Sequence, residues 1–145
     1  MKITGTFSEK EQILIPVEIK IDKFNLRGSA EFLLDTGSTI SFINESTALK
    51  IHLDYSQLLY RETSTGIGGG ADVYEIDGYT RLTFVSEENT KTIPRKNFLA
   101  MQHNFCEHVT EDTRKRILAL QGVIGMDMIK GFRLTTAGQN YTLEV

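Results

Sequence analysis

Alternation of apolar and polar residues dominates the chain and predicts β-strands. From Ile13 to Ile21 every odd position is apolar, which places those side chains on one face of an extended strand. A turn over residues 22–25 leads into a second alternating run that starts at Leu26. This run ends in three consecutive apolar residues, 32–34, and such a stretch is typical of a strand that is buried on both faces.

The rest of the chain continues this pattern, with short helical segments between the strands. Helices are predicted over 45–51, with Asn44 as the expected N-cap, over 110–121, where Thr110 precedes two acidic residues, and over 126–130. Further extended segments are predicted at 40–43, 58–65, 73–85, 90–101 and 123–124, followed by a final hairpin that turns at 137–140. No repeat or linker divides the sequence, and 145 residues fit one mostly β domain over residues 1–145.

Composition and charge remove several functional classes. The chain has 16 Lys and Arg against 19 Asp and Glu, a formal net charge of −3, so no global field attracts nucleic acid or an anionic membrane. The single cysteine, Cys106, cannot form an intrachain disulfide, which fits a reducing compartment. No apolar run approaches the roughly 20 residues that span a bilayer, and the N-terminus has no signal-peptide pattern. These observations predict a soluble cytoplasmic protein.

One acidic residue, Asp35, lies between two apolar runs and needs an explanation. Residues 32–34 precede it, and residues 40–43 resume the apolar pattern after a short turn. An ionised carboxylate that is buried there without a partner costs several kcal/mol. An aspartate in a turn also commonly accepts hydrogen bonds from neighbouring amides. On local context alone, a structural role for Asp35 and a chemical role both stay open.

Three motifs give the sequence a resemblance to a known protein family. Residues 33–38 read Leu-Leu-Asp-Thr-Gly-Ser and resemble the active-site signature of aspartic proteases. A single copy of this signature in a short chain is similar to the retropepsin (retroviral-type) family. A glycine-rich segment resembles the tip of that family's flap hairpin, which is expected here over about residues 61–76. Its residues are Gly66, Ile67, Gly68, Gly69 and Gly70.

The third motif lies near the end of the chain. Val123, Ile124 and Gly125 resemble the family's pair of hydrophobic residues followed by glycine. Together with the short helix predicted after it, this motif is especially similar to the protease domain of DNA-damage-inducible ubiquitin-shuttle proteins. The three motifs occur in the family's order, and the resemblance covers roughly residues 13–145.

The resemblance implies both a fold and a reaction. The fold is a closed, single-domain β-barrel of the retropepsin type with one or two short helices and a flap hairpin. The reaction is that of an aspartic endopeptidase, a hydrolase that needs no metal and no cofactor. Two carboxylates about 3 Å apart cannot both ionise, so they share a proton and serve as base and acid. Because the sequence offers one such residue, we expect a homodimer that pairs two copies of Asp35 around an extended peptide substrate.

The resemblance also assigns supporting roles to the residues around Asp35. Thr36 is expected to donate its hydroxyl across the dimer axis, and the amide of Gly37 to point at the carboxylate. Ser38 is expected to hydrogen-bond the outer carboxylate oxygen. Gly125 is expected to let its strand pass close to the Asp35 loop.

Two other functions compete with the protease interpretation. The first is a catalytically silent peptide-binding or dimerisation module on the same fold. The second is nucleotide binding, because Gly66, Gly68 and Ala71 match a dinucleotide-binding fingerprint. That fingerprint requires a hydrophobic strand before the loop and a helix after it. The residues after Gly70 have a strand-like pattern, which argues against it.

A further stretch, residues 97–121, has no assigned role. It contains a helical insertion, predicted at about 110–121, and three residues that suggest a metal site, namely His103, Cys106 and His108. Structural zinc usually has two separated pairs of ligands, and no second pair is present. A solvated loop with a lone thiol is therefore the favoured interpretation of these three residues.

Overall fold

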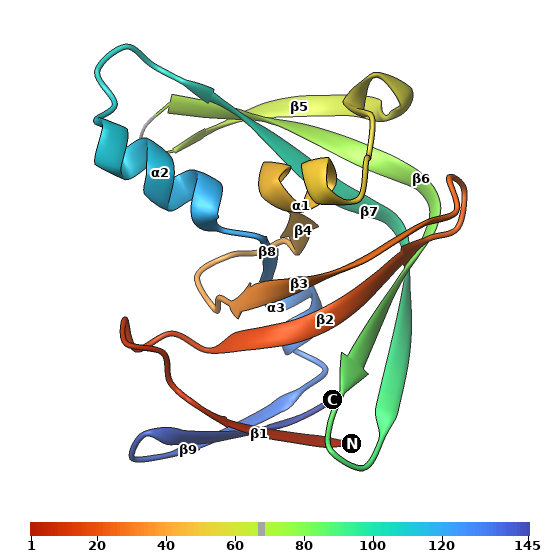
Figure 1. The fold of residues 1–145 in the computed structure, drawn as a ribbon, viewed down its shortest axis with the longest axis vertical. Helices are drawn as coiled ribbons and strands as arrows, with labels where there is room; N and C mark the ends of the chain where they lie inside the picture. The colour runs from red at the N-terminus through yellow and green to blue at the C-terminus, as the bar shows by residue number, and fades with distance from the viewer. Residues whose placement is uncertain (67–68) are drawn as a thin grey trace.

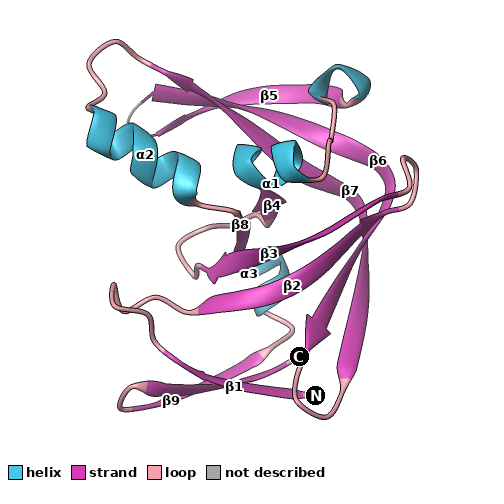
Figure 2. Cartoon of the chain, viewed as in Figure 1, coloured by secondary structure: helices cyan, strands magenta, loops and turns pink. Residues whose placement is uncertain are grey.

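The computed structural model describes residues 1–66 and 69–145 as a β-structure with three short α-helices (Figures 1 and 2). The strands are β1 (Lys2–Thr6), β2 (Leu14–Ile21), β3 (Leu26–Leu34), β4 (Phe42–Ile43), β5 (Leu59–Gly66), β6 (Gly69–Val85), β7 (Thr90–Phe105), β8 (Gly122–Ile124), β9 (Arg133–Ala137) and β10 (Asn140–Glu144). The helices are α1 (Glu45–Lys50), α2 (Glu111–Ala119) and α3 (Met126–Ile129), and a 3₁₀ turn spans Tyr55–Gln57.

Six strands close into a barrel. The larger sheet has the order β2-β3-β8-β4-β7-β6-β5, and β2 also pairs with β6, so the first six strands of that order form a closed ring. The predicted closed, mostly β barrel is confirmed. The three α-helices lie where the sequence pattern predicts them. The resemblance implied only one or two short helices.

The alternating pattern of the first hairpin fills the barrel. Side chains at odd positions of β2, from Ile15 to Ile21, are almost completely buried, and Phe32 of β3 is 0% exposed. The end of β3 differs from the expectation of burial on both faces, because Leu33 and Leu34 are only half-buried in the single chain. A smaller apolar cluster joins strands β4, β6, β7 and β8 and consists of Phe42, Ala71, Val73, Leu99, Met101 and Val123.

A second, three-stranded sheet with the order β1-β10-β9 lies at the end of the molecule where both termini meet (Figure 1). The final hairpin is confirmed, but β1 was not predicted. Within β1 only Ile3 is buried, so the strand has no alternating signal of its own. Its partner β10 supplies the apolar face through Tyr141 and Leu143.

The glycine-rich segment lies at the turn of the β5–β6 hairpin. Backbone pairing continues to Gly66 opposite Gly69, whereas Ile67 and Gly68 lie outside the described residues. The 17-residue strand β6 follows at once and pairs with β7 along most of its length. A dinucleotide-binding loop requires a helix at this point, so the strand contradicts the nucleotide interpretation.

The polar helix α2 is attached to the barrel mainly at its C-terminal end. As predicted, the Thr110 hydroxyl caps the helix and accepts from the Thr113 amide at 3.2 Å. Asn44 occupies the N-cap position of α1 as predicted, but its side chain makes no capping bond to that helix. Instead it donates to the carbonyls of Ile117 and Leu120, at 3.0 and 2.9 Å. Asn44 therefore joins the beginning of α1 to the end of α2.

Candidate active site

Asp35 occupies the first position of a loop, residues 35–41, that connects β3 to β4. The Asp35 amide donates to the Ile124 carbonyl at 3.0 Å, so β8 fixes the start of the loop. The carboxylate accepts a hydrogen bond from the Gly37 amide at 2.8 Å. In the single chain Asp35 is half-buried and Thr36 is exposed, so the front of the loop is open to a partner or a ligand.

The hydrogen bond from Gly37 is also the one that a purely structural turn aspartate makes. Asp54 accepts the corresponding bond from the Ser56 amide at 2.9 Å. Together with the Ser56 hydroxyl, this bond lowers the pKa of Asp54 below its usual value. The local turn therefore does not separate the two roles that the sequence left open for Asp35. The surroundings of the loop do distinguish Asp35 from the exposed Asp54.

The back of the 35–41 loop rests on the junction between β8 and α3. Val123 and Ile124 of β8 are buried and pair in parallel with the last two residues of β3. The Met126 amide donates to the Ser38 carbonyl at 2.8 Å. A Cβ on Gly125 would lie 2.3 Å from the Ile40 carbonyl oxygen, so only glycine fits this approach. The structure thus brings the first and third sequence motifs into direct contact.

Gly37 and Ser38 follow Asp35 in the loop. A Cβ on Gly37 would lie 3.1 Å from the Asp35 carboxylate, so a side chain at this position would crowd the turn. The Ser38 hydroxyl, however, donates to the Ile40 carbonyl at 2.8 Å and not to the carboxylate. In the single chain, Ser38 therefore stabilises the turn of the loop.

The sequence interpretation missed three polar residues that interact at the back of the loop, namely Ser41 at the end of the loop itself, Asp127 and Arg95. The Ser41 hydroxyl donates to the Asp127 carboxylate at 2.6 Å, and a guanidinium nitrogen of Arg95 donates to the other carboxylate oxygen at 3.0 Å. The signal available in the sequence was weak. Ser41 is one polar residue in the apolar run 40–43, and Asp127 is one acid inside the short apolar helix α3.

In Figure 1 the 35–41 loop and α2 lie on the left, whereas strands β5 and β6 run across the top of the molecule and β6 continues down the right side. The glycine-rich motif itself is not in contact with the other two motifs through any hydrogen bond recorded for the described residues. A link between the hairpin and α2 runs through β7. In that strand His103 pairs with Ala71 of the hairpin and stacks on Phe105, and Arg114 of α2 lies over the Phe105 ring at 5.1 Å.

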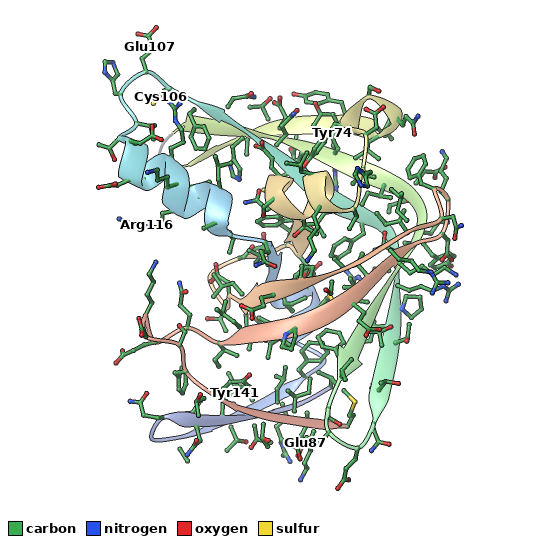
Figure 3. All side chains as sticks on the ribbon, viewed as in Figure 1. Tyr74, Glu87, Cys106, Glu107, Arg116 and Tyr141 are labelled. Atoms are coloured by element: carbon green, nitrogen blue, oxygen red, sulfur yellow. The ribbon has the colours of Figure 1, made fainter. Side chains whose placement is uncertain are left out.

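The candidate metal residues do not converge. The Asn44 amide group donates to helix carbonyls, so its oxygen faces His103 Nε2 at 2.8 Å, and that nitrogen carries a proton. Burial lowers the pKa of His103, an effect that the nearby Glu45 opposes. Cys106 is exposed on the loop between β7 and α2 (Figure 3). Within the described ranges, no three His, Cys, Asp or Glu side chains form a group suited to a metal ion.

A solved structure shares the fold of this chain. The structure of a retropepsin-like aspartic protease from Rickettsia conorii superimposes with a TM-score of 0.58 at 13% identity, over 99% of this chain and 90% of that chain. This likeness establishes the retropepsin fold. Two further structures show lower similarity. They are EIAV protease with an inhibitor (TM-score 0.47, 13% identity, 88% of this chain and 93% of that chain) and the retroviral protease-like domain of Ddi1 from Leishmania major (TM-score 0.45, 16% identity, 84% and 79%).

A family model matches part of the sequence. Residues 17–85 match the aspartyl protease family model, a span that includes Asp35 and the glycine-rich segment. No curated protein matches the chain significantly in sequence. The family match and the fold together confirm the resemblance to retropepsin-like aspartic proteases. Separately, no helix among the described residues is long and apolar enough to cross a membrane.

Proposed function

We propose that the protein is an aspartic endopeptidase that acts as a homodimer. The observation that carries the proposal is the placement of Asp35 at the front of a loop whose back is fixed by β8, in a chain with the retropepsin fold. The Asp-Thr-Gly triplet occurs once in the sequence, so one chain supplies one carboxylate. A second copy, related by a two-fold axis, supplies the other.

Peptide hydrolysis by such a pair follows from its shared proton. The ionised carboxylate accepts a proton from a water molecule held between the two Asp35 side chains, and the oxygen of that water attacks the scissile carbonyl carbon. The protonated carboxylate first hydrogen-bonds the carbonyl oxygen and then supplies the proton to the leaving amine. Carboxylates alone provide the base and the acid, so the reaction proceeds without a metal or cofactor. Activity is expected to fall at high pH, when the dyad loses its last proton.

The exposed Thr36 and the β5–β6 hairpin complete the proposed site. Thr36 would donate its hydroxyl across the dimer axis. The hairpin would serve as the flap, a mobile cover that admits an extended peptide and then excludes water. The peptide backbone would pair with the hairpin and with the floor of the site, and alternate side chains would enter pockets. Ile67 is the proposed apolar contact at the flap tip.

Cleavage of a denatured protein from pH 3 to pH 8, at several enzyme concentrations, tests this function. We expect wild type to cleave with a specific activity that rises with concentration, because dimers form by mass action, and Asp35→Asn to be inactive. Cleavage that persists in Asp35→Asn would place the catalytic group elsewhere. Specific activity that is independent of concentration down to dilutions where sedimentation shows monomers would contradict the dimeric mechanism.

The alternative, a catalytically silent module, gives a different pattern. A peptidic aspartic-protease inhibitor would raise the melting temperature by binding the folded state, but neither wild type nor variant would cleave. The partners expected under both interpretations are a second copy of the chain and an extended peptide. A cytoplasmic location stays a prediction that cell fractionation can check.

A further inference from the structure

Ser41 is the last residue of the 35–41 loop, and its hydroxyl binds a buried amide at the back of that loop. Ser41 is only 2% exposed. The hydroxyl oxygen accepts a hydrogen bond from the Gly125 amide at 2.8 Å, in a buried environment. A buried amide without a partner is unfavourable, so the orientation of this hydroxyl matters to the position of Gly125.

Asp127 determines that orientation. A hydroxyl rotates freely and can either donate or accept, but here it donates to Asp127 Oδ1 at 2.6 Å. With its proton committed to the carboxylate, the hydroxyl presents a lone pair to the Gly125 amide. The other carboxylate oxygen accepts from Arg95 at 3.0 Å, which fixes the side chain of Asp127. The four groups form one series of hydrogen bonds, of which the two that involve the Asp127 carboxylate are charge-assisted.

This series of hydrogen bonds ends at the 35–41 loop. Gly125 packs so closely on the loop that an added Cβ would lie 2.3 Å from the Ile40 carbonyl oxygen and 2.8 Å from the Ser38 carbonyl oxygen. The neighbouring Ile124 carbonyl accepts the Asp35 amide. A shift of Gly125 therefore displaces the loop that carries Asp35.

We infer that Asp127 is a positioning residue for the proposed reaction. It acts through Ser41 and Gly125 and holds the Asp35 carboxylate in register with its counterpart from the second subunit. This inference rests on the proposed function and adds a specific role to a residue far from the substrate. A displacement of about 1 Å at a catalytic group costs on the order of 100-fold in rate, so a modest loosening of the loop is sufficient to reduce kcat.

The chain offers a matched control for Asp127. Asp22 lies directly after β2 and forms a similar ion pair with Arg81 of β6, at 3.0 Å. The Asp side chains of the two pairs have comparable exposure, 32% for Asp22 and 27% for Asp127. Asp22 lies shortly before the start of β3, whereas the 35–41 loop follows the end of that strand. Removal of either carboxylate therefore breaks one ion pair, but only one of the two changes reaches Asp35.

The test compares Asp127→Ala, Asp127→Asn and Asp22→Ala with wild type, at concentrations where activity per dimer has reached its plateau. We expect Asp127→Ala to lower kcat by about 10–100-fold with KM within about twofold. Asp127→Asn should retain most of kcat, because its amide oxygen still accepts from Ser41. Asp22→Ala should leave kcat unchanged. Equal kcat values for Asp127→Ala and Asp22→Ala would overturn the inference.

A double substitution and an activity-independent measurement complete the test. In the Ser41→Ala background, Asp127→Ala should cost nothing further in kcat, since its effect runs through the missing hydroxyl; additive losses would contradict this route. Amide exchange of Gly125 and of the 35–41 loop should accelerate in Asp127→Ala and not in Asp22→Ala. If wild type fails to cleave, the proposed function fails, and the exchange result still decides whether Asp127 fixes the loop.

Discussion

The 35–41 loop and helix α2 lie on the same side of the molecule but are held in different ways (Figure 1). The loop rests on backbone hydrogen bonds to the buried strand β8 and on a glycine that no other residue can replace. Helix α2 has no buried residue. Two side chains from the start of α1 hold the C-terminal end of α2 and the residues that follow it. Asn44 donates to the carbonyls of Ile117 and Leu120, and the Thr47 hydroxyl donates to the Gln121 carbonyl at 2.6 Å.

The difference shows how one barrel can fix chemistry and leave a neighbouring element adjustable. A change behind the loop is transmitted to Asp35 because the contacts there are close and leave little space. A change in α2 breaks a few polar bonds at the barrel surface, so it should loosen the helix and leave Asp35 in place. Substitutions in the two regions should therefore separate effects on catalysis from effects on local order.

The largest effect is expected for Asp35→Asn. We expect a loss of cleavage of roughly 10⁴-fold, the order found when a catalytic carboxylate becomes an amide, with little change in the midpoint of urea unfolding. Asp54→Asn is the matched control, since Asp54 accepts the same type of turn hydrogen bond. Equal activity in the two variants would show that Asp35 is only a turn residue.

Gly125→Ala should destabilise the protein and impair activity together. The added methyl group would lie 2.3 Å from the Ile40 carbonyl oxygen, and such overpacking costs about 1–3 kcal/mol in the free energy of unfolding. Gly131→Ala is the control, because its Cβ would meet the nearest atom at an ordinary 3.5 Å. Urea unfolding of both variants measures the difference. A Gly125→Ala protein as stable as Gly131→Ala would mean that the loop has room to move.

Asn44→Ala should act on α2. Asn44 is fully buried, and its removal deletes two hydrogen bonds to the end of α2, a loss of about 2 kcal/mol. The Ile117 carbonyl keeps the Leu120 amide as a donor, and the Leu120 carbonyl keeps the Ser46 hydroxyl. We expect faster amide exchange across α2, while kcat per dimer stays within about threefold of wild type because Asp35 is held elsewhere. A large loss of kcat without faster exchange in α2 would contradict the proposal that the two regions are held independently.

Thr110→Ala should weaken the other end of α2 by a smaller amount. The Thr110 hydroxyl accepts from the Thr113 amide, and loss of an N-cap costs about 1 kcal/mol. Thr110→Ser keeps the hydroxyl and serves as the control. Amide exchange in the first turn of α2 should rise in the alanine variant alone, and a similar rise in the serine variant would point to another cause.

The smallest effect concerns the pH dependence of stability at His103. Burial lowers the pKa of His103 below its usual 6.5, although Glu45 acts in the opposite direction. As pH falls below about 6.5, the unfolded chain takes up the proton first, so the free energy of unfolding should decrease with acidification. His103→Gln keeps a donor for Asn44 and should flatten this part of the profile. Urea unfolding at pH 7 and pH 5 measures the slope, and equal slopes in both proteins would exclude His103 as its source.

The barrel strands were readable from the sequence because each has its own alternating pattern. Strand β1 lacked that signal, since its burial depends on a partner more than 130 residues away in sequence, with Ile3 paired to Leu143. The bonds of Asn44 to α2 were equally hidden. Asn44 has the sequence context of a helix cap, and only the folded chain brings Ile117 and Leu120 to it.

For the candidate site, too, the sequence predicted the local motifs but not the long-range contacts. Local motifs identify Asp35, Gly37 and Gly125 because turn geometry and close packing restrict residue type within a few positions. The Ser41 and Asp127 contact spans 86 residues, and a lone polar residue in an apolar run does not name its partner. The expected bond from Ser38 to the carboxylate is absent in the single chain, where its hydroxyl binds Ile40.

The shared dyad is the central claim, and a mixing experiment tests it most directly. A fixed amount of wild type is combined with increasing Asp35→Asn protein and allowed to exchange subunits before cleavage is measured. With random pairing of subunits, activity should fall to about half at equal amounts and to about a tenth at ninefold excess of the variant. Activity that stays constant as the variant is added would show that each chain works without a second Asp35.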